Sequence, residues 1–291
     1  MVGMASAAVL TYYGRITGTV TVNQAVKLDG LDVPGGSMDI TETVSGTAGN
    51  LILGDMHNLV NYADKKIMVN LVSTGISAPY GSFDGLTVYP EYRLDARVDD
   101  DALFLVLNDT IIWKDFVGLS FNYLIAVGPL QWIPQCNLAL RDADGNVKYY
   151  ASWHSFRTGI NGTIGVRASI TYDADDFYIF DTNWNLIGFW GDLKKDSWWY
   201  NELKDLQFKY FVMQAGDTSN DPNTGPWEQV VWLSKFTIYP ARDIIGIALP
   251  TSAYGWTLQC VEFRMVYEFA YNAYPGEYKV KTDVVPLGFG P

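Results

Sequence analysis

The chain has little cysteine, little histidine and no long apolar run. Its 291 residues include 2 Cys and 2 His. Cys136 and Cys260 share no ligand-type spacing with His57 or His154, which argues against a zinc site. The two thiols either form one disulfide or stay reduced, and spacing alone does not decide between these states. No stretch of 18 apolar residues is present, so we expect no membrane-spanning helix.

Runs of Lys and Arg are also missing, and the balance of charge is acidic. The formal net charge is −12, from 20 Lys and Arg against 32 Asp and Glu. Nucleic acids and anionic membrane surfaces are themselves negatively charged, so the composition argues against both as partners. Only seven of the acidic residues are Glu. Asp favours turns and loops over helix interiors, so this skew favours loop-rich β-structure.

Aromatic residues and glycine are abundant. Hydrophobic residues make up 48% of the chain and aromatic residues 15%, with 10 Trp, 19 Tyr and 27 Gly. A chain of this length and hydrophobic content can bury a substantial core. Aromatic and β-branched residues favour strands, and glycine favours the turns between them. The composition therefore predicts an all-β protein.

The first 22 residues divide into three segments. Ala5-Ser6-Ala7 has the small-x-small pattern of a signal-peptidase site, so residues 1–7 are interpreted as the remnant of a signal peptide. The alternative is an ordinary apolar N-terminus. Residues 8–13 are apolar and uncharged, and Gly14 separates them from residues 15–22, which alternate as a half-buried strand does. Under the signal-peptide interpretation the mature protein begins near Ala8 and is extracellular.

The composition changes twice along the chain. Short alternating strands are expected in residues 15–78 and again in residues 240–291, whereas residues 79–239 contain nine of the ten Trp. Within this Trp-rich block one short helix is expected over Ser197–Leu206, capped by Asp196 or Ser197. The predicted architecture is a jelly-roll-like β-sandwich interrupted by a second, jelly-roll or lectin-like β-sandwich.

Three stretches carry a family resemblance: Ala8–Val22 (AVLTYYGRITGTVTV), Gly49–Asp55 (GNLILGD) leading to Asn61, and Tyr274–Val280 (YPGEYKV). They resemble archaeal bundling pilins, which are related to the bacterial biofilm-matrix fibre protein TasA and to camelysin. The likeness covers about the first 75 and the last 50 residues. It implies a secreted subunit that polymerises by donor-strand complementation, in which the N-terminal strand of one subunit fills a groove of its neighbour. The Trp-rich block is a large insertion relative to the smallest members of this group. The resemblance therefore leaves open whether the chain is a shaft, minor or tip subunit of a pilus.

Strand addition also has a physical rationale in this sequence. An added strand satisfies exposed backbone groups of a sheet edge, while its alternate side chains enter an apolar groove. The contact is head-to-tail and does not close on itself, so it propagates into a filament. Gly14 would act as the hinge. The alternative is that the segment pairs inside its own domain. The proposed donor strand consists of Ala8, Val9, Leu10, Thr11, Tyr12 and Tyr13.

Three further kinds of site are suggested by short patterns. Asp142, Asp144 and Asn146 alternate around Gly145, as oxygen ligands of a calcium loop do, although a plain hairpin turn explains the same residues. Asn108 and Asn161 begin Asn-x-Thr sequons. No other cofactor is expected. The third pattern is the abundance of tryptophan, which either binds carbohydrate by stacking or fills the core. The candidates for stacking are Trp198 with Trp199, and Trp184 with Trp190.

Catalysis is not expected. The Trp-rich block has only Glu91, Glu202 and Glu228, which are well separated, so no alternating glutamate pair of a glycosidase is present. No Gly-x-Ser-x-Gly motif surrounds a serine. Two hypotheses remain: a self-polymerising subunit of a bundling pilus or biofilm fibre, and a monomeric cell-surface adhesin whose Trp-rich block binds glycans.

Overall fold

The structure is a computed structural model that describes residues 26–33, 38–63, 65–96, 101–128, 133–154, 162–215, 229–249 and 260–289. The predictions for residues 1–7, 8–14 and 15–22 lie outside these ranges. The described chain consists almost entirely of β-strands, which confirms the all-β prediction. The helical elements within these ranges are α3 (Trp190–Leu193), α4 (Ser197–Leu203) and the single-turn 3-10 helices η1 (Pro79–Gly81), η2 (Trp113–Asp115) and η3 (Ala174–Asp176).

The described strands form two antiparallel sheets. Sheet A runs, in spatial order, β12 (Arg167–Asp173), β9 (Gly118–Val127), β16 (Val230–Tyr239), β7 (Leu86–Asp95), β18 (Cys260–Phe269), β5 (His57–Asn61), β1 (Val26–Leu28) and β2 (Leu31–Asp32), with β4 (Leu51–Leu53) also on β18. Sheet B runs β14 (Leu186–Phe189), β13 (Tyr178–Phe180), β11 (Val147–Trp153), β10 (Gln135–Arg141), β15 (Gln207–Ala215), β8 (Asp101–Ile112), β17 (Ile244–Leu249), β6 (Ile67–Ser77), β19 (Gly276–Phe289) and β3 (Met38–Gly46). Residues alternate between the core and the outer face along each strand.

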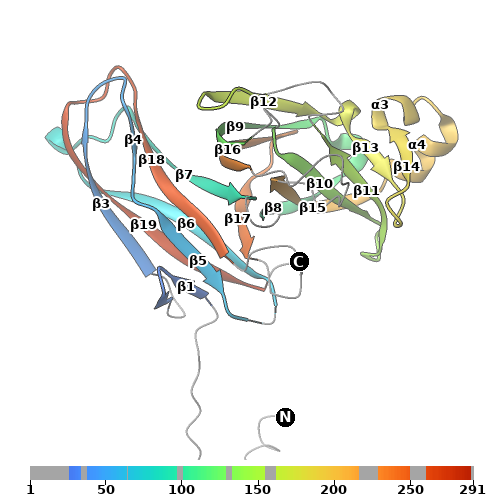
Figure 1. Cartoon of the computed structure of the whole chain (residues 1–291), viewed down its shortest axis with the longest axis horizontal. Coiled ribbons are helices and arrows are strands. Elements are labelled where there is room, and N and C mark those ends of the chain that lie inside the picture. The colour runs from blue at the N-terminus through green and yellow to red at the C-terminus, as the bar shows by residue number, and fades with distance from the viewer. Residues whose placement is uncertain are drawn as a thin grey trace, which may run out of the picture.

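The two sheets form two lobes (Figure 1). One lobe contains β1, β3, β4, β5, β6, β18 and β19, and the other contains β9 to β16 with both α-helices. The strands β7, β8 and β17 lie between the lobes. The predicted sandwich architecture is therefore present, and residues 79–239 supply the strands of the second lobe.

The sheets continue across both predicted domain boundaries. In sheet A, β7 pairs with β18 from Glu262 opposite Arg93 to Phe269 opposite Leu86. In sheet B, β17 lies between β8 and β6, because Ile247 pairs with Leu105 on one side and with Val69 on the other. One hydrophobic cluster contains buried residues of both lobes. The lobes therefore share their sheets and their main core.

The local sequence accounts for individual elements. In β10 the core receives Cys136, Leu138 and Leu140, while Asn137 and Ala139 between them face outward. Helix α4 begins as predicted, because the Asp196 side chain accepts hydrogen bonds from the backbone N–H groups of Trp198 and Trp199. It ends at Leu203 rather than at the predicted Leu206.

Aromatic side chains fill the core of the Trp-rich lobe. Trp113 is fully buried, with its ring centroid 5.5 Å from that of Phe116, 5.7 Å from Trp190 and 6.2 Å from Phe208. Trp153 is also buried. Most of the described tryptophans are therefore buried. This agrees with the interpretation that tryptophans of the Trp-rich block fill the core.

A buried ion cluster lies on the outer face of sheet A. The Glu91 side chain on β7 is only 1% exposed and is bound by two guanidinium groups, those of Arg167 on β12 and Arg264 on β18. Arg264 donates from Nη2 to Glu91 Oε2 at 2.7 Å. Because Arg167 reaches over β9 and β16, this cluster joins strands of the two lobes.

Candidate functional site

The first candidate site is the edge of sheet B at β3. Among the described residues, β3 is hydrogen-bonded to β19 on one side and has no strand on the other. Ile40 and Val44 face the core, and Thr41 and Thr43 face solvent. A bare edge of this length presents backbone groups that can pair with another strand.

Exposed apolar side chains lie on the segment of sheet A that contacts the inner face of β3. The Asp55 backbone N–H donates to Glu42 Oε1 of β3 at 2.7 Å, which links the segment after β4, in sheet A, to the inner face of β3 in sheet B. Leu51, Leu53 and Met56 are 41%, 42% and 45% exposed. Leu51 and Leu53 are on β4, which pairs with β18, so these side chains belong to the opposite sheet of the same lobe. The sequence-predicted donor strand of residues 8–13 and its hinge at Gly14 lie outside the described residues.

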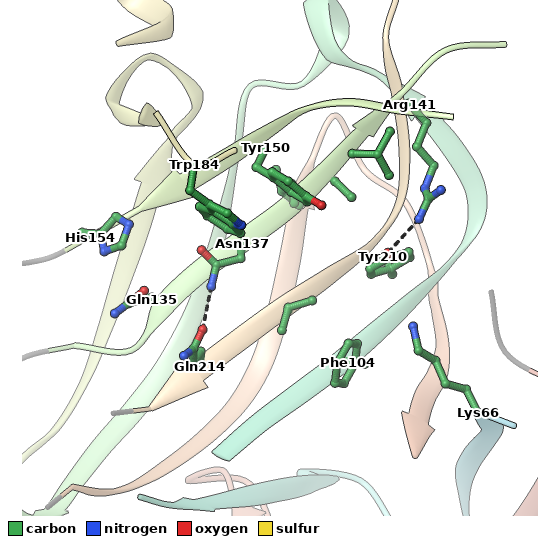
Figure 2. Close-up of a pocket in the computed structure, with 14 residues that line it drawn as sticks. Lys66, Phe104, Gln135, Asn137, Arg141, Tyr150, His154, Trp184, Tyr210 and Gln214 are labelled. Atoms are coloured by element: carbon green, nitrogen blue, oxygen red, sulfur yellow. Dashed lines mark hydrogen bonds between the residues drawn. The ribbon is translucent and has the colours of Figure 1, made fainter. Parts of the chain in front are cut away.

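The second candidate site is a cavity of about 690 Å³ on the outer face of sheet B (Figure 2). Its lining follows from the alternation of side chains along β10 and β15. One set of residues on these strands points into the core, and the other set points into the cavity. In Figure 2, Arg141, Tyr210 and Lys66 lie on one side of the cavity and His154 and Trp184 on the other. The described lining residues include Lys66, Arg141 and His154 and contain no Asp or Glu.

Polar side chains form a connected row across this face. Asn137 donates from Nδ2 to Gln214 Oε1 at 2.9 Å, and it accepts a hydrogen bond from the Ser152 hydroxyl. Ser152 Oγ is also hydrogen-bonded to His154 Nε2 at 2.6 Å. Asn137 and Ser152 are directly opposite each other in the sheet. The row is therefore positioned by rigid strands rather than by loops.

Trp184 forms an aromatic wall of the cavity. Its ring is stacked on that of Tyr150, with centroids 4.5 Å apart and an interplanar angle of 4°. It remains 53% exposed, and its backbone φ is +62°. A bulky residue with positive φ is strained.

The turn that carries Trp184 is built on Asp181. Asp181 Oδ1 accepts from the backbone N–H groups of Asn183 and Asn185, each at 2.8 Å, and Oδ2 accepts from the Asn185 amide at 2.8 Å. These hydrogen bonds, led by that from the Asn185 side chain, hold the pKa of the Asp181 carboxyl below its ordinary value. The ionised carboxylate therefore stabilises the turn.

We expect Asp181→Asn to lower the melting temperature in a pH-dependent way. A carboxyl whose folded-state pKa is depressed contributes stability above its unfolded-state pKa of about 3.9 and loses it as pH falls through the folded value. The difference in melting temperature between wild type and variant should be constant from pH 5 to 7 and shrink below about pH 4. Thermal melts by circular dichroism over this range measure it, and a difference that does not vary with pH would contradict this role.

The other predicted aromatic sites do not form a flat platform. Trp198 is 61% exposed and Trp199 is half-buried; their rings meet edge to face, with centroids 4.5 Å apart at 84°. Neither residue lines the cavity. Trp190, which the sequence pairs with Trp184, is buried in the core. The partner of Trp184 is instead Tyr150, which sequence analysis missed because it lies on another strand, although the alternating polar residues of β10 indicate an outward face nearby.

The predicted calcium ligands form a hairpin turn. Asp142 Oδ1 accepts from the backbone N–H groups of Asp144 and Asn146 at 3.0 and 2.9 Å, and Lys148 lies 3.2 Å from Oδ2. The hydrogen bond from the Asn146 backbone is the main reason that the pKa of Asp142 is lowered. Within the described ranges, no three His, Cys, Asp or Glu side chains gather where they could hold a metal ion. The plain-turn alternative accounts for the hydrogen bonds that Asp142 accepts from the backbone, and the calcium site stays a prediction.

The remaining predicted positions are dispersed. Asn108 is exposed on β8, whereas Asn161 lies outside the described residues. Cys136 is buried on β10 and Cys260 is half-buried at the start of β18, and the structure contains no disulfide between them. Burial raises the pKa of the Cys136 thiol, which keeps it protonated. No helix in the described ranges is long and apolar enough to cross a membrane.

No family model and no curated protein matches this chain. Weak similarities exist to solved structures from infectious bursal disease virus. The Gx strain structure is 10% identical, with 86% of this chain and 79% of that chain covered and a TM-score of 0.25. The VP2 subviral particle is 10% identical, with 98% and 87% covered and a TM-score of 0.22. Similarity at this level gives no information about the function of this chain.

Proposed function

We propose that the protein is an extracellular structural subunit of a bundling-pilus or biofilm-fibre type, which polymerises when residues 8–13 of one copy add to β3 of the next. The observation that carries this proposal is the free side of β3 in the described chain. A strand of nine residues with an unpaired edge invites pairing, and monomeric proteins usually protect such edges. Exposed Leu51 and Leu53 lie on β4 of sheet A, the opposite sheet of the same lobe.

The dimensions and energies of strand addition are compatible with this edge. At about 3.3 Å per residue, a six-residue donor is shorter than the nine-residue β3. Each apolar side chain that the donor buries contributes roughly 1.5–3 kcal/mol before ordering costs. Because donor and acceptor are different surfaces of the same chain, the contact is head-to-tail and extends into a filament. Signal-peptide cleavage after residue 7 would free the donor.

Deletion of residues 8–13 is expected to abolish filaments while leaving a folded β-protein. The mature chain from Ala8 and the deleted chain are compared by electron microscopy, by sedimentation and by far-UV circular dichroism. A synthetic peptide of residues 8–14 should then bind the deleted chain and raise its melting temperature without restoring filaments. A scrambled peptide of the same composition is the matched control.

Two results would count against the proposal. Filaments that persist after the deletion would overturn the donor-strand mechanism. Wild-type protein that stays monomeric at high concentration, combined with a lower melting temperature of the deleted chain, would mean that residues 8–13 pair within their own subunit.

A further inference from the structure

The cavity on sheet B has the chemistry of a sugar-binding site. Its volume of about 690 Å³ falls within the range of about 300–1,000 Å³ that is typical of ligand pockets. It combines an exposed aromatic ring, a row of amides and two basic side chains on one continuous face (Figure 2). We propose that this face binds an oligosaccharide that carries carboxylate groups, with one sugar ring stacked on Trp184.

The stacking surface is the best-supported part of the site. The apolar C–H face of a sugar ring packs on a flat aromatic face, and Tyr150 backs Trp184 at 4.5 Å, so the pair acts as one rigid platform. A structural tryptophan is normally buried, whereas this one is more than half exposed. The positive φ of Trp184 costs conformational energy, and the ring is too exposed for its burial to offset that cost. The exposed ring lines the cavity, so its face is available to a ligand.

The amide row can serve sugar hydroxyls. An amide offers two donor hydrogens and two acceptor lone pairs, which matches the donor and acceptor character of a hydroxyl. In its contacts with described residues, Asn137 uses one hydrogen for Gln214 and one lone pair for Ser152. One hydrogen and one lone pair therefore remain for a ligand. The Ser152 and Gln214 contacts hold the amide in place.

The basic side chains indicate an acidic ligand. The whole chain carries a net charge of −12, yet the described lining contains Lys66 and Arg141 and no carboxylate. Arg141 donates to the Gly145 carbonyl at 2.7 Å and to the Tyr210 hydroxyl at 3.2 Å, which leaves further guanidinium donors. A guanidinium binds carboxylates in a bidentate manner. Uronic-acid residues present a carboxylate together with hydroxyls and an apolar ring face.

The test uses the full mature chain and two defined probes, a tetramer of galacturonic acid and a neutral galactose tetramer. We expect calorimetric binding of the acidic probe, weakened by salt, and at least tenfold weaker binding of the neutral probe. Trp184→Gly should reduce affinity for the acidic probe at least tenfold. Glycine suits the positive φ, so this variant should melt at or above the wild-type temperature. Trp198→Ala, which removes a comparably exposed ring outside the cavity, should bind normally.

Each other outcome is decisive. Absence of binding of either probe at millimolar concentration overturns the proposal. Binding that is lost in Trp198→Ala but kept in Trp184→Gly overturns the location. Equal affinity for the two probes, or an Arg141→Gln variant that binds the acidic probe as wild type does, overturns the assignment of an acidic ligand. The proposal is independent of filament formation, since a monomeric chain presents the same face of sheet B.

Discussion

Replacing Glu91 by Gln is expected to reduce the free energy of unfolding by about 3 kcal/mol. The side chain is almost fully buried, and its carboxylate accepts from Arg167 Nη2 at 2.9 Å and from Arg264 Nε at 2.9 Å. Glutamine has the same shape but no charge, and its NH₂ group would face guanidinium donors. Removing one partner of a buried ion pair costs about 3–5 kcal/mol. We expect a cost at the lower end of this range because the Arg167 side chain is 30% exposed and water can solvate it.

Urea unfolding at pH 7 measures this effect, and the same sheet offers a matched control. Glu268 on β18 pairs with Lys235, but its side chain is 43% exposed, so Glu268→Gln should cost less than about 1 kcal/mol. In a double-mutant cycle, Arg264→Met in the Glu91→Gln background should cost less than Arg264→Met alone. A Glu91→Gln variant as stable as the Glu268→Gln variant would show that the cluster does not hold the lobes together.

Replacing Trp113 by Ala is expected to cost about 3–5 kcal/mol, the usual range for removal of a buried Trp or Phe ring. The ring is inaccessible to solvent and contacts aromatic side chains from η3–β13, α3 and β15, so its loss opens a cavity among rigid neighbours. Trp113→Phe should cost less than the alanine variant. The indole N–H has no hydrogen-bond partner among the described residues, so its removal breaks no hydrogen bond there.

Trp198→Ala is the matched control for this prediction. Trp198 is exposed on α4, and alanine is a good helix former, so the change in unfolding free energy should stay within about 0.5 kcal/mol. Denaturant unfolding and near-UV circular dichroism distinguish the two variants. Equal losses at Trp113 and Trp198 would contradict the division of the tryptophans into core and surface residues.

Local patterns predicted many elements of this protein. The short alternating strands predicted in residues 240–291 correspond to β17, β18 and β19, and the Asp142–Asn146 turn joins β10 to β11. The cap at Asp196 predicts the start of α4. These signals are local because they depend on side-chain period, turn chemistry or capping within a few residues. The end of α4 was predicted three residues too late.

The candidate sites were predicted less well, because they depend on contacts between distant segments. The fold separates the suggested pair of Trp184 and Trp190: Trp190 enters the core, while Trp184 stacks on Tyr150, 34 positions earlier in the chain. The Asp142 carboxylate, predicted to bind calcium or to close a turn, accepts hydrogen bonds from the backbone of the turn that it begins. The resemblance to bundling pilins and the donor strand stay predictions.

The sequence by itself determined the all-β class, most strands of both lobes and the acidic character of the chain, because composition and alternation act within single segments. The tertiary structure alone decided that the two lobes share continuous sheets, since β7 joins β18 across about 170 residues of chain. It also decided which tryptophans are buried and which residues meet on the outer face of sheet B. Strand pairing and burial are properties of segments brought together from far apart, and a local pattern does not contain them.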